Sequence, residues 1–313
     1  MPLSTNEATN ETAAKLITTL RGAFSTPASF RPAHARGILV SGTFTPSSTA
    51  ASLSSAYHFN NTTPVTSRFS NSTGIHMIPD NDANANPRGF ATRFHLPNAP
   101  DGKRSHTDII AHSTKFFPVR TGELFLEMLG AIGSGTIQDF LTTHPSAAAF
   151  VQDPKPSPVS FGTEKYFGVN AFKLINKDGK ETFVRYRITP DAGEAHLSDA
   201  EAKGKDAAYL HNEIQTRIAD GPVSFKLLAQ IAQAGDVTDD ATIHWPNDRE
   251  IVELGTIKIE SVVQDNDEEQ RKLIFDPIPR VEGVAASDDP LLDMRASIYL
   301  QSGKDRRSHP YEK

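Results

Sequence analysis

The stretch NAFKLINKDGKETFVRYRI, residues 170–188, carries the clearest structural signal in the chain. Two short runs rich in β-forming residues, 170–175 and 182–188, flank the segment Asn176-Lys177-Asp178-Gly179-Lys180. Asparagine, aspartate and glycine at such a position favour a tight turn between two strands. The stretch therefore predicts an antiparallel β-hairpin.

Strands of the same kind are predicted on both sides of this hairpin. The predicted strands are residues 38–44, 65–70, 90–96, 107–119, 223–230 and 251–263. Helical spacing of apolar residues predicts helices at 11–24, 122–132, 137–141 and 199–218. Within 11–24 the apolar positions are Ala14, Ile17, Leu20 and Ala23, which predict an arm packed on the body or on another subunit. The acidic run Asp265–Glu269 is interpreted as a solvated loop. Repeated strands joined by hairpins favour an antiparallel β-barrel.

Composition excludes several classes of protein. A chain of 313 residues can form one large core, and its net charge of -6, without a basic stripe, argues against nucleic acid as a partner. The absence of cysteine excludes disulfides, iron–sulfur clusters and thiolate catalysis. No apolar run approaches the roughly 20 residues that span a bilayer, and no signal peptide is recognisable in residues 1–30. We therefore expect a cytoplasmic protein that does not bind membranes.

Arg295 and Tyr299 near the C-terminus form the strongest candidate site. Residues four apart on a helix lie on one face, so Arg295 can sit over the phenol oxygen of Tyr299. A guanidinium in that place favours the phenolate, which is an anionic ligand for iron. The spacing alone arises often by chance, so other motifs have to support it.

Six further segments supply that support, because they resemble motifs of the haem catalases in the order in which that family carries them. They are RPAHARG at 31–37, VTSRFS at 65–70, PRGFATRF at 87–94, TDIIAHST at 107–114, HWP at 244–246 and FDP at 275–277. The resemblance implies an α+β fold with an antiparallel eight-stranded β-barrel and surrounding helices. It also implies haem b (iron protoporphyrin IX), held between the barrel wall and the helix that carries Tyr299 as the iron ligand.

The same resemblance implies roles for individual residues. His34 would be the acid and base that moves a proton during cleavage of the peroxide bond, oriented by Ser70. Phe117 corresponds to an aromatic residue that stacks on the porphyrin, although ordinary core packing explains it equally well. The haem propionates need buried cations, and the counterparts of the family's three arginines are Arg31, Arg68 and Arg306.

Two departures from the family pattern narrow the interpretation. His112 and Ser113 stand where the main branch has two asparagines, the first of which donates a hydrogen bond to peroxide. His112 can occupy the same space and donate through a ring nitrogen, or it can turn away. The chain also stops 14 residues after Tyr299. We therefore expect an arm (1–30) and a haem-binding domain (31–313) without the C-terminal helical domain that is associated with NADPH, as in the short catalase-related peroxidases.

Three functions remain open at this point. The first is a haem peroxidase that reduces hydrogen peroxide or an organic hydroperoxide with a small organic donor, with weak catalase activity. The second is an enzyme that rearranges fatty-acid hydroperoxides, like the allene oxide synthases. The third is a non-enzymatic haem sensor, which the presence of His34 argues against. A homo-oligomer is also expected.

Overall fold

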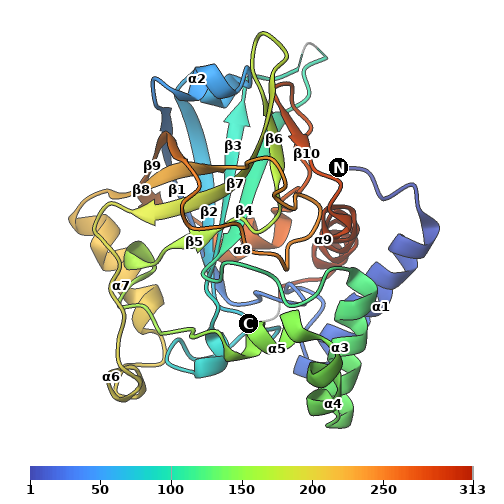
Figure 1. The fold of residues 1–313 in the computed structure, drawn as a ribbon. Helices are drawn as coiled ribbons and strands as arrows, with labels where there is room; N and C mark the ends of the chain where they lie inside the picture. The colour runs from blue at the N-terminus through green and yellow to red at the C-terminus, as the bar shows by residue number, and fades with distance from the viewer. Residues whose placement is uncertain (100, 312–313) are drawn as a thin grey trace.

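A closed β-barrel forms the centre of the computed structural model, which describes residues 1–99 and 101–311 (Figure 1). The hydrogen-bonded order is β7-β5-β4-β3-β2-β1-β9-β8, and β8 pairs back with β7, so eight antiparallel strands close on themselves. Strands β6 and β10 extend the sheet beyond β7. The structure confirms the predicted α+β fold with an eight-stranded antiparallel barrel.

The strands and helices have the following bounds. The strands are β1 (Gly37–Pro46), β2 (Thr63–Ser70), β3 (Gly89–Leu96), β4 (Ser105–His112), β5 (Tyr166–Phe167), β6 (Phe172–Ile175), β7 (Glu181–Pro190), β8 (Val223–Ile231), β9 (Ile251–Val262) and β10 (Val284–Ala286). The α-helices are α1 (Glu7–Phe24), α2 (Ala50–Leu53), α3 (Gly122–Ser134), α4 (Ile137–Thr143), α5 (Pro145–Gln152), α6 (Asp199–Lys203), α7 (Tyr209–Asp220), α8 (Asn266–Lys272) and α9 (Pro290–Ser308). Short 3-10 turns are η1 (Tyr57–Phe59), η2 (Ala83–Ala85) and η3 (Phe161–Thr163).

Alternation along the strands separates a packed interior from an outer face. Phe69 on β2 and Phe90 on β3 face each other in register and stack with ring centroids 4.6 Å apart inside the main hydrophobic core. Successive residues of a strand point to opposite faces. Their neighbours Ser70 and Gly89 therefore belong to the outer face of the barrel wall.

Helix α9 runs beside the barrel and is covered by α1, which comes from the other end of the chain (Figure 1). The side chain of Arg21 on α1 donates to Asp305 at 2.9 Å, and Gln301 on α9 donates to the Asn10 carbonyl at 3.0 Å. The predicted N-terminal helix thus packs on the body of its own chain. Its buried face agrees with the prediction in part: Ile17 and Leu20 are buried, whereas Ala14 and Ala23 are exposed and Ala13 and Leu16 are buried instead.

Three sequence predictions of secondary structure are wrong in detail. The strand predicted over 107–119 ends at His112, because the chain there leaves the sheet for a loop. The helix predicted over 199–218 is two helices, α6 and α7, separated at Gly204. The acidic run Asp265–Glu269, interpreted as a loop, forms most of α8, whose buried residue is Gln270.

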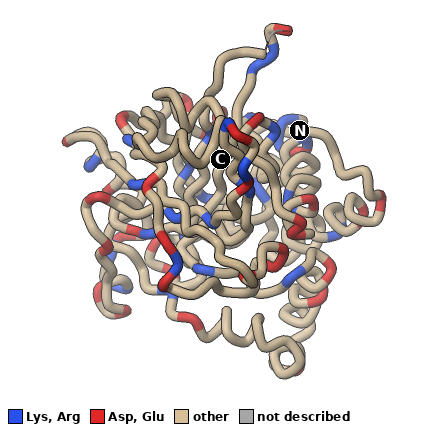
Figure 2. The backbone as a smooth tube through the Cα atoms, turned by 45° about the horizontal axis from the view of Figure 1, so that its top comes forward, with Lys and Arg blue, Asp and Glu red and all other residues tan. Residues whose placement is uncertain are grey.

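Charged residues of both signs alternate over the molecule, with no basic stripe along the chain in the view of Figure 2. None of the helices within the described residues is long and apolar enough to cross a membrane.

Candidate haem site

Strand register brings three of the predicted site segments together on the outer face of the barrel. Ser70 pairs with Gly89, and Gly89 pairs with His112 on the next strand. Directly opposed residues of antiparallel strands point to the same face. Since Phe69 and Phe90 occupy the interior, the side chains of Ser70 and His112 point outward on either side of Gly89.

His34 lies in the loop before β1, and its imidazole lies over Gly89. Its Nδ1 is 3.0 Å from the Ser70 hydroxyl oxygen. A Cβ atom on Gly89 would come within 2.9 Å of that ring nitrogen and 2.4 Å of the Ser70 hydroxyl. Only glycine at position 89 therefore leaves room for the contact between His34 and Ser70.

The backbone at His34 is strained and is held by Arg68. Its φ of 52° lies in the left-handed region, which costs a non-glycine residue on the order of 1 to 3 kcal/mol. Arg68 donates to the carbonyls of His34 and Ala35 at 2.9 and 3.0 Å. Gly37 gives the guanidinium this room, because a Cβ atom there would be 2.5 Å from the Arg68 Cζ atom. The buried arginine therefore fixes the loop that presents the imidazole.

Both imidazoles on this face are neutral at physiological pH. Burial, followed by the charges of Arg68, Arg295 and Arg31, lowers the pKa of His34 to about 4. Burial, followed by the influence of His34 and Arg295, lowers the pKa of His112 to about 3. His34 acts electrostatically on His112, so the two imidazoles lie near each other, and the space beside both rings is the candidate site for a small ligand.

His112 shares the outer face of the sheet with Gly89, and its ring is held at Nδ1 by Thr114. Its Nδ1 is 2.6 Å from the Thr114 hydroxyl oxygen and 3.3 Å from the Thr114 backbone nitrogen. The adjacent Ser113 accepts a hydrogen bond from the backbone N–H of Arg88 at 2.9 Å. Ser113 therefore supports the loop, whereas His112, the other departure from the family pattern, lies near His34.

Helix α9 carries Arg295, whose charge acts on both His34 and His112 and which therefore lies near the two imidazoles. Arg295 Nε donates to the Tyr299 hydroxyl at 3.2 Å, as the four-residue spacing predicts. Arg295 also donates to the side-chain oxygen of Asn170, and the Asn170 amide donates to Asp289 at 2.8 Å. A line of polar contacts thus runs from Tyr299 through Arg295 and Asn170 to Asp289.

Asn170 and Asp289 are site residues that sequence reasoning missed. Asp289 precedes Pro290 and caps α9 by accepting from the Leu291 N–H at 2.9 Å, so an aspartate-proline pair at a helix start was an available signal. Asn170, which is 1% exposed, begins the decisive hairpin stretch and carries no local signal of its role.

Arg31, Arg68 and Arg306 converge beside this space. Arg31 and Arg306 both donate to the Leu273 carbonyl, at 2.9 and 3.0 Å, and Arg68 donates to Gln270 at 2.7 Å. Burial and mutual repulsion lower the pKa of all three, that of Arg68 to about 9. Among the described residues none of the three forms an ion pair with a carboxylate, and the buried Arg306 Nε has no partner.

The positive charge of these three arginines, which no carboxylate balances among the described residues, shows whether haem fits the site. Buried cations need anions, and a haem group brings two propionates. The donor set therefore fits the group. Tyr299 lies close enough to Arg31 to act electrostatically on its guanidinium, which places the phenol beside the same cluster.

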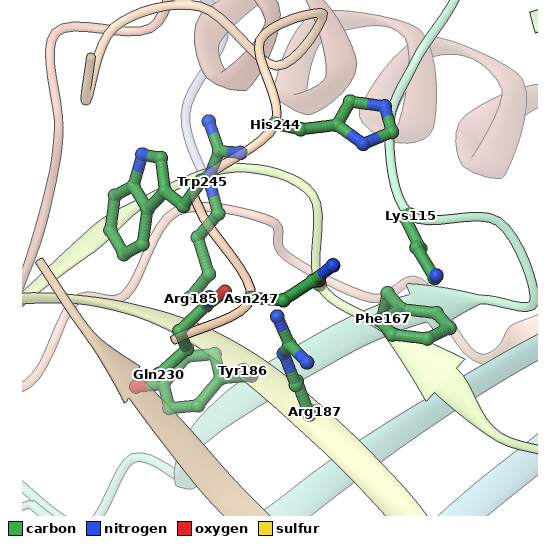
Figure 3. Close-up of a pocket in the computed structure, with 10 residues that line it drawn as sticks. Lys115, Phe167, Arg185, Tyr186, Arg187, Gln230, His244, Trp245 and Asn247 are labelled. Carbon is green, nitrogen blue, oxygen red and sulfur yellow. The ribbon is translucent and has the colours of Figure 1, made fainter. Parts of the chain in front are cut away.

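Phe117 is partly buried in a hydrophobic environment. Its ring centroid lies 5.3 Å from that of Phe125 on α3, and it packs against the cluster of Val169, Ala241 and Leu291. A separate cavity of 30 Å³, shown in Figure 3, is lined by Arg185, His244, Trp245 and their neighbours, and includes none of the predicted site residues. Its volume holds only about one water molecule, which is too small for an organic substrate.

Comparison with solved structures defines the class of fold. A bacterial catalase superposes with a TM-score of 0.78 at 24% sequence identity, over 97% of this chain and 62% of that one. The chain thus has the catalase barrel, and spans about three-fifths of the length of that catalase.

Sequence comparison identifies the family. The model of the family described as "Catalase" matches residues 28–313. A "Catalase-related peroxidase" of Mycolicibacterium paratuberculosis is 35% identical, covering 93% of this chain and 95% of its own length. A second protein of that description, from Synechococcus elongatus, is 29% identical, covering 96% and 90%. The chain belongs to the catalase family, whose members are haem-dependent oxidoreductases that act on peroxide.

Proposed function

We propose that this protein is a haem b peroxidase that reduces hydrogen peroxide or an organic hydroperoxide with a small organic donor, with weak catalase activity. The observation that carries the proposal is the arrangement of the site. Two neutral imidazoles lie on one side, and a tyrosine paired with an arginine lies on the other. Buried arginines without carboxylate partners lie at its edge.

The residues that would hold haem follow from this arrangement. Tyr299 would ligate the iron through the oxygen that Arg295 contacts, and Phe117 would pack against the porphyrin. Arg31, Arg68 and Arg306 bind the propionates. Bound haem would supply an iron centre that peroxide oxidises and an organic donor reduces one electron at a time.

His34 is the proton carrier in this scheme. A neutral imidazole can take the proton of bound peroxide at Nε2 and return it to the departing oxygen. At the start Nε2 must be unprotonated, so the single proton of the neutral ring lies on Nδ1. The Ser70 hydroxyl oxygen can accept a hydrogen bond from this Nδ1–H, because a hydroxyl acts as donor or acceptor. Ser70 therefore orients the ring without fixing its tautomer.

His112 distinguishes this protein from the main branch of the family. It stands where the main branch has an amide that orients peroxide, and its place beside Gly89 and near His34 supports a role at the same position. An imidazole is bulkier than the amide and positions its donor differently. We propose that this change disfavours reaction of a second peroxide as reductant, so that oxidation of organic donors dominates.

The division of the chain and its assembly belong to the same proposal. Residues 1–30 form an arm on the haem-binding domain of residues 31–313, supported by the contacts of α1 with α9. We further propose a cytoplasmic homo-oligomer.

Product analysis tests the proposed function directly. The haem-loaded protein is supplied with hydrogen peroxide and a dye donor, and separately with a fatty-acid hydroperoxide without donor. Oxidised dye in proportion to consumed peroxide supports the peroxidase. An allene oxide or its hydrolysis products, without dye oxidation, would instead establish the rearranging enzyme.

A further inference from the structure

We propose that Thr114 holds His112 in the tautomer that carries its proton on Nε2. His112 is then a fixed hydrogen-bond donor to the space beside the His34 and His112 rings. The inference rests on the proposed function in taking that space as the peroxide site. It gives the two imidazoles different tasks: His34 moves a proton, and His112 only donates a hydrogen bond.

Two contacts at Nδ1 of His112 determine which ring nitrogen carries the proton. The Thr114 backbone N–H points at this nitrogen with 3.3 Å between the heavy atoms. A backbone N–H can only donate, so Nδ1 has to accept. A neutral imidazole with an accepting Nδ1 carries its single proton on Nε2.

The Thr114 hydroxyl strengthens the same choice. Its oxygen lies 2.6 Å from Nδ1 and 3.4 Å from the Phe116 carbonyl oxygen, its other acceptor. The shorter contact is a strong hydrogen bond and the longer one is near the limit, so the hydroxyl proton is directed to Nδ1. Thr114 is 1% exposed, so it is shielded from the bulk solvent that would compete for these hydrogen bonds.

The position of the ring then determines where Nε2–H points. Thr114 occupies the Nδ1 edge, and Nε2 forms no hydrogen bond to any described residue. His112 shares its face of the sheet with Gly89, over which the His34 ring lies. The free N–H therefore points into the space that the two imidazoles border. The lowered pKa of His112 is consistent with this orientation, because a neutral ring has only one N–H group to donate.

The contrast with His34 comes from the partner of each Nδ1. A serine hydroxyl contacts His34, and it can exchange the roles of donor and acceptor. The Thr114 backbone amide contacts His112, and this group can only donate a hydrogen bond. His112 is thus unable to take a proton from peroxide at Nε2, and Thr114 is the positioning residue that imposes this.

Nitrogen NMR of ¹⁵N-histidine-labelled protein tests the inference. The protein is loaded with gallium(III) protoporphyrin, a diamagnetic stand-in for haem, and the His112 signals are assigned by their loss in His112→Asn. We expect a protonated Nε2 and an accepting Nδ1, unchanged from pH 8 to pH 5. A protonated Nδ1, or two tautomers in comparable amounts, overturns the inference.

Two variants of Thr114 separate positioning from mere packing. Thr114→Val removes the hydroxyl at nearly constant shape, and we expect the minor tautomer to gain roughly fivefold in population, as one lost hydrogen bond implies. Thr114→Ser keeps the hydroxyl and should match the parent. Equal spectra for the two variants, both differing from the parent, would assign the effect to packing and overturn the role of Thr114. Failure to bind protoporphyrin would count against the proposed function instead, and the tautomer remains measurable in the unloaded protein.

Discussion

The two sides of the candidate site are built by different geometry. On the side of α9, Arg295 and Tyr299 meet because one helical turn separates them. On the barrel side, Ser70, Gly89 and His112 meet only because three strands pair in one register. A one-residue slip of β4 would turn His112 into the barrel interior, since alternate residues face opposite ways. The helix side therefore depends on local spacing, and the barrel side on the closed sheet.

The two sides also differ in charge. On the helix side Arg295 and Arg306 carry positive charge, whereas the barrel side combines the guanidinium of Arg68 on β2 with two neutral imidazoles, whose pKa values are lowered by burial and by nearby arginines. We expect the helix side to control retention of haem and the barrel side to control reaction with peroxide. Each prediction below tests this division of tasks.

The largest effect is expected for Tyr299→Phe. It removes the proposed anionic ligand from the helix side, so the purified variant should contain little haem and lose the absorption spectrum of a tyrosine-ligated iron. Absorption spectroscopy and haem extraction measure both. Tyr57→Phe, which alters a 43% exposed tyrosine, is the matched control. Full haem content with an unchanged spectrum in Tyr299→Phe would move the ligand elsewhere.

The second-largest effect is expected when Arg68 and Arg306 are both replaced by Leu. Each lost charged hydrogen bond to a propionate costs roughly 1 to 3 kcal/mol of haem affinity, so the double variant should be mostly apoprotein. Haem titration followed by absorbance gives the affinity. Arg120→Leu, a surface arginine paired with Asp239, is the control. Because Arg68 also holds the His34 loop, circular dichroism must show an intact fold; normal haem occupancy would contradict the proposed clamp.

His34→Ala should separate the two sides. Haem should stay bound, because the helix side is intact, while reaction with peroxide slows roughly 10²- to 10⁴-fold, as for loss of a positioned acid and base. Stopped-flow absorbance measures the rate, with His309→Ala at the exposed C-terminal end as control. In the parent protein the rate should be constant near neutrality and fall as the pH decreases through about 4, where the imidazole becomes protonated. An unaffected rate in His34→Ala would remove the proposed mechanism.

A smaller effect is expected for Asn170→Ala, which tests whether the helix side depends on the barrel. The substitution removes an acceptor for Arg295 and a donor to Asp289, and leaves both helix residues in place. Loss of about 1 kcal/mol, the typical value of one hydrogen bond, weakens haem affinity about fivefold. Unchanged affinity and spectrum would show that the helical pair acts alone.

The smallest change is expected for His112→Asn, which alters a ratio. The amide restores the donor of the main branch, so oxygen evolution should rise relative to dye oxidation, with haem content constant. An oxygen electrode and a dye assay on one preparation give the ratio. If the ratio stays the same, His112 does not set the balance between the two activities.

The comparison also explains what the sequence could predict. The pair Arg295 and Tyr299 follows from helical periodicity, and the main strands follow from β-forming residues and turn chemistry, so those predictions agree with the structure. The two-residue strand β5 and the three-residue strand β10 carry too few residues for a recognisable pattern.

The sequence predictions are wrong or incomplete where contacts between residues far apart in the chain determine the structure. Helix α8 is stabilised by Glu268 with Arg271 and by burial of Gln270, whose side chain accepts from Arg68 some 200 residues away. The run of acidic residues, considered alone, predicts a solvated loop. Asn170 was missed for the same reason, because its partners Arg295 and Asp289 lie over 100 residues further along the chain.

The order of the elements along the chain has a consequence for biosynthesis. Helix α9 follows every strand of the barrel in sequence, and α1, which precedes them all, rests on it. A growing polypeptide can therefore fold its barrel while one wall of the site has yet to emerge from the ribosome. We expect the prosthetic group to be acquired only after α9 has been synthesised, with docking of α1 on α9 as a late step of assembly.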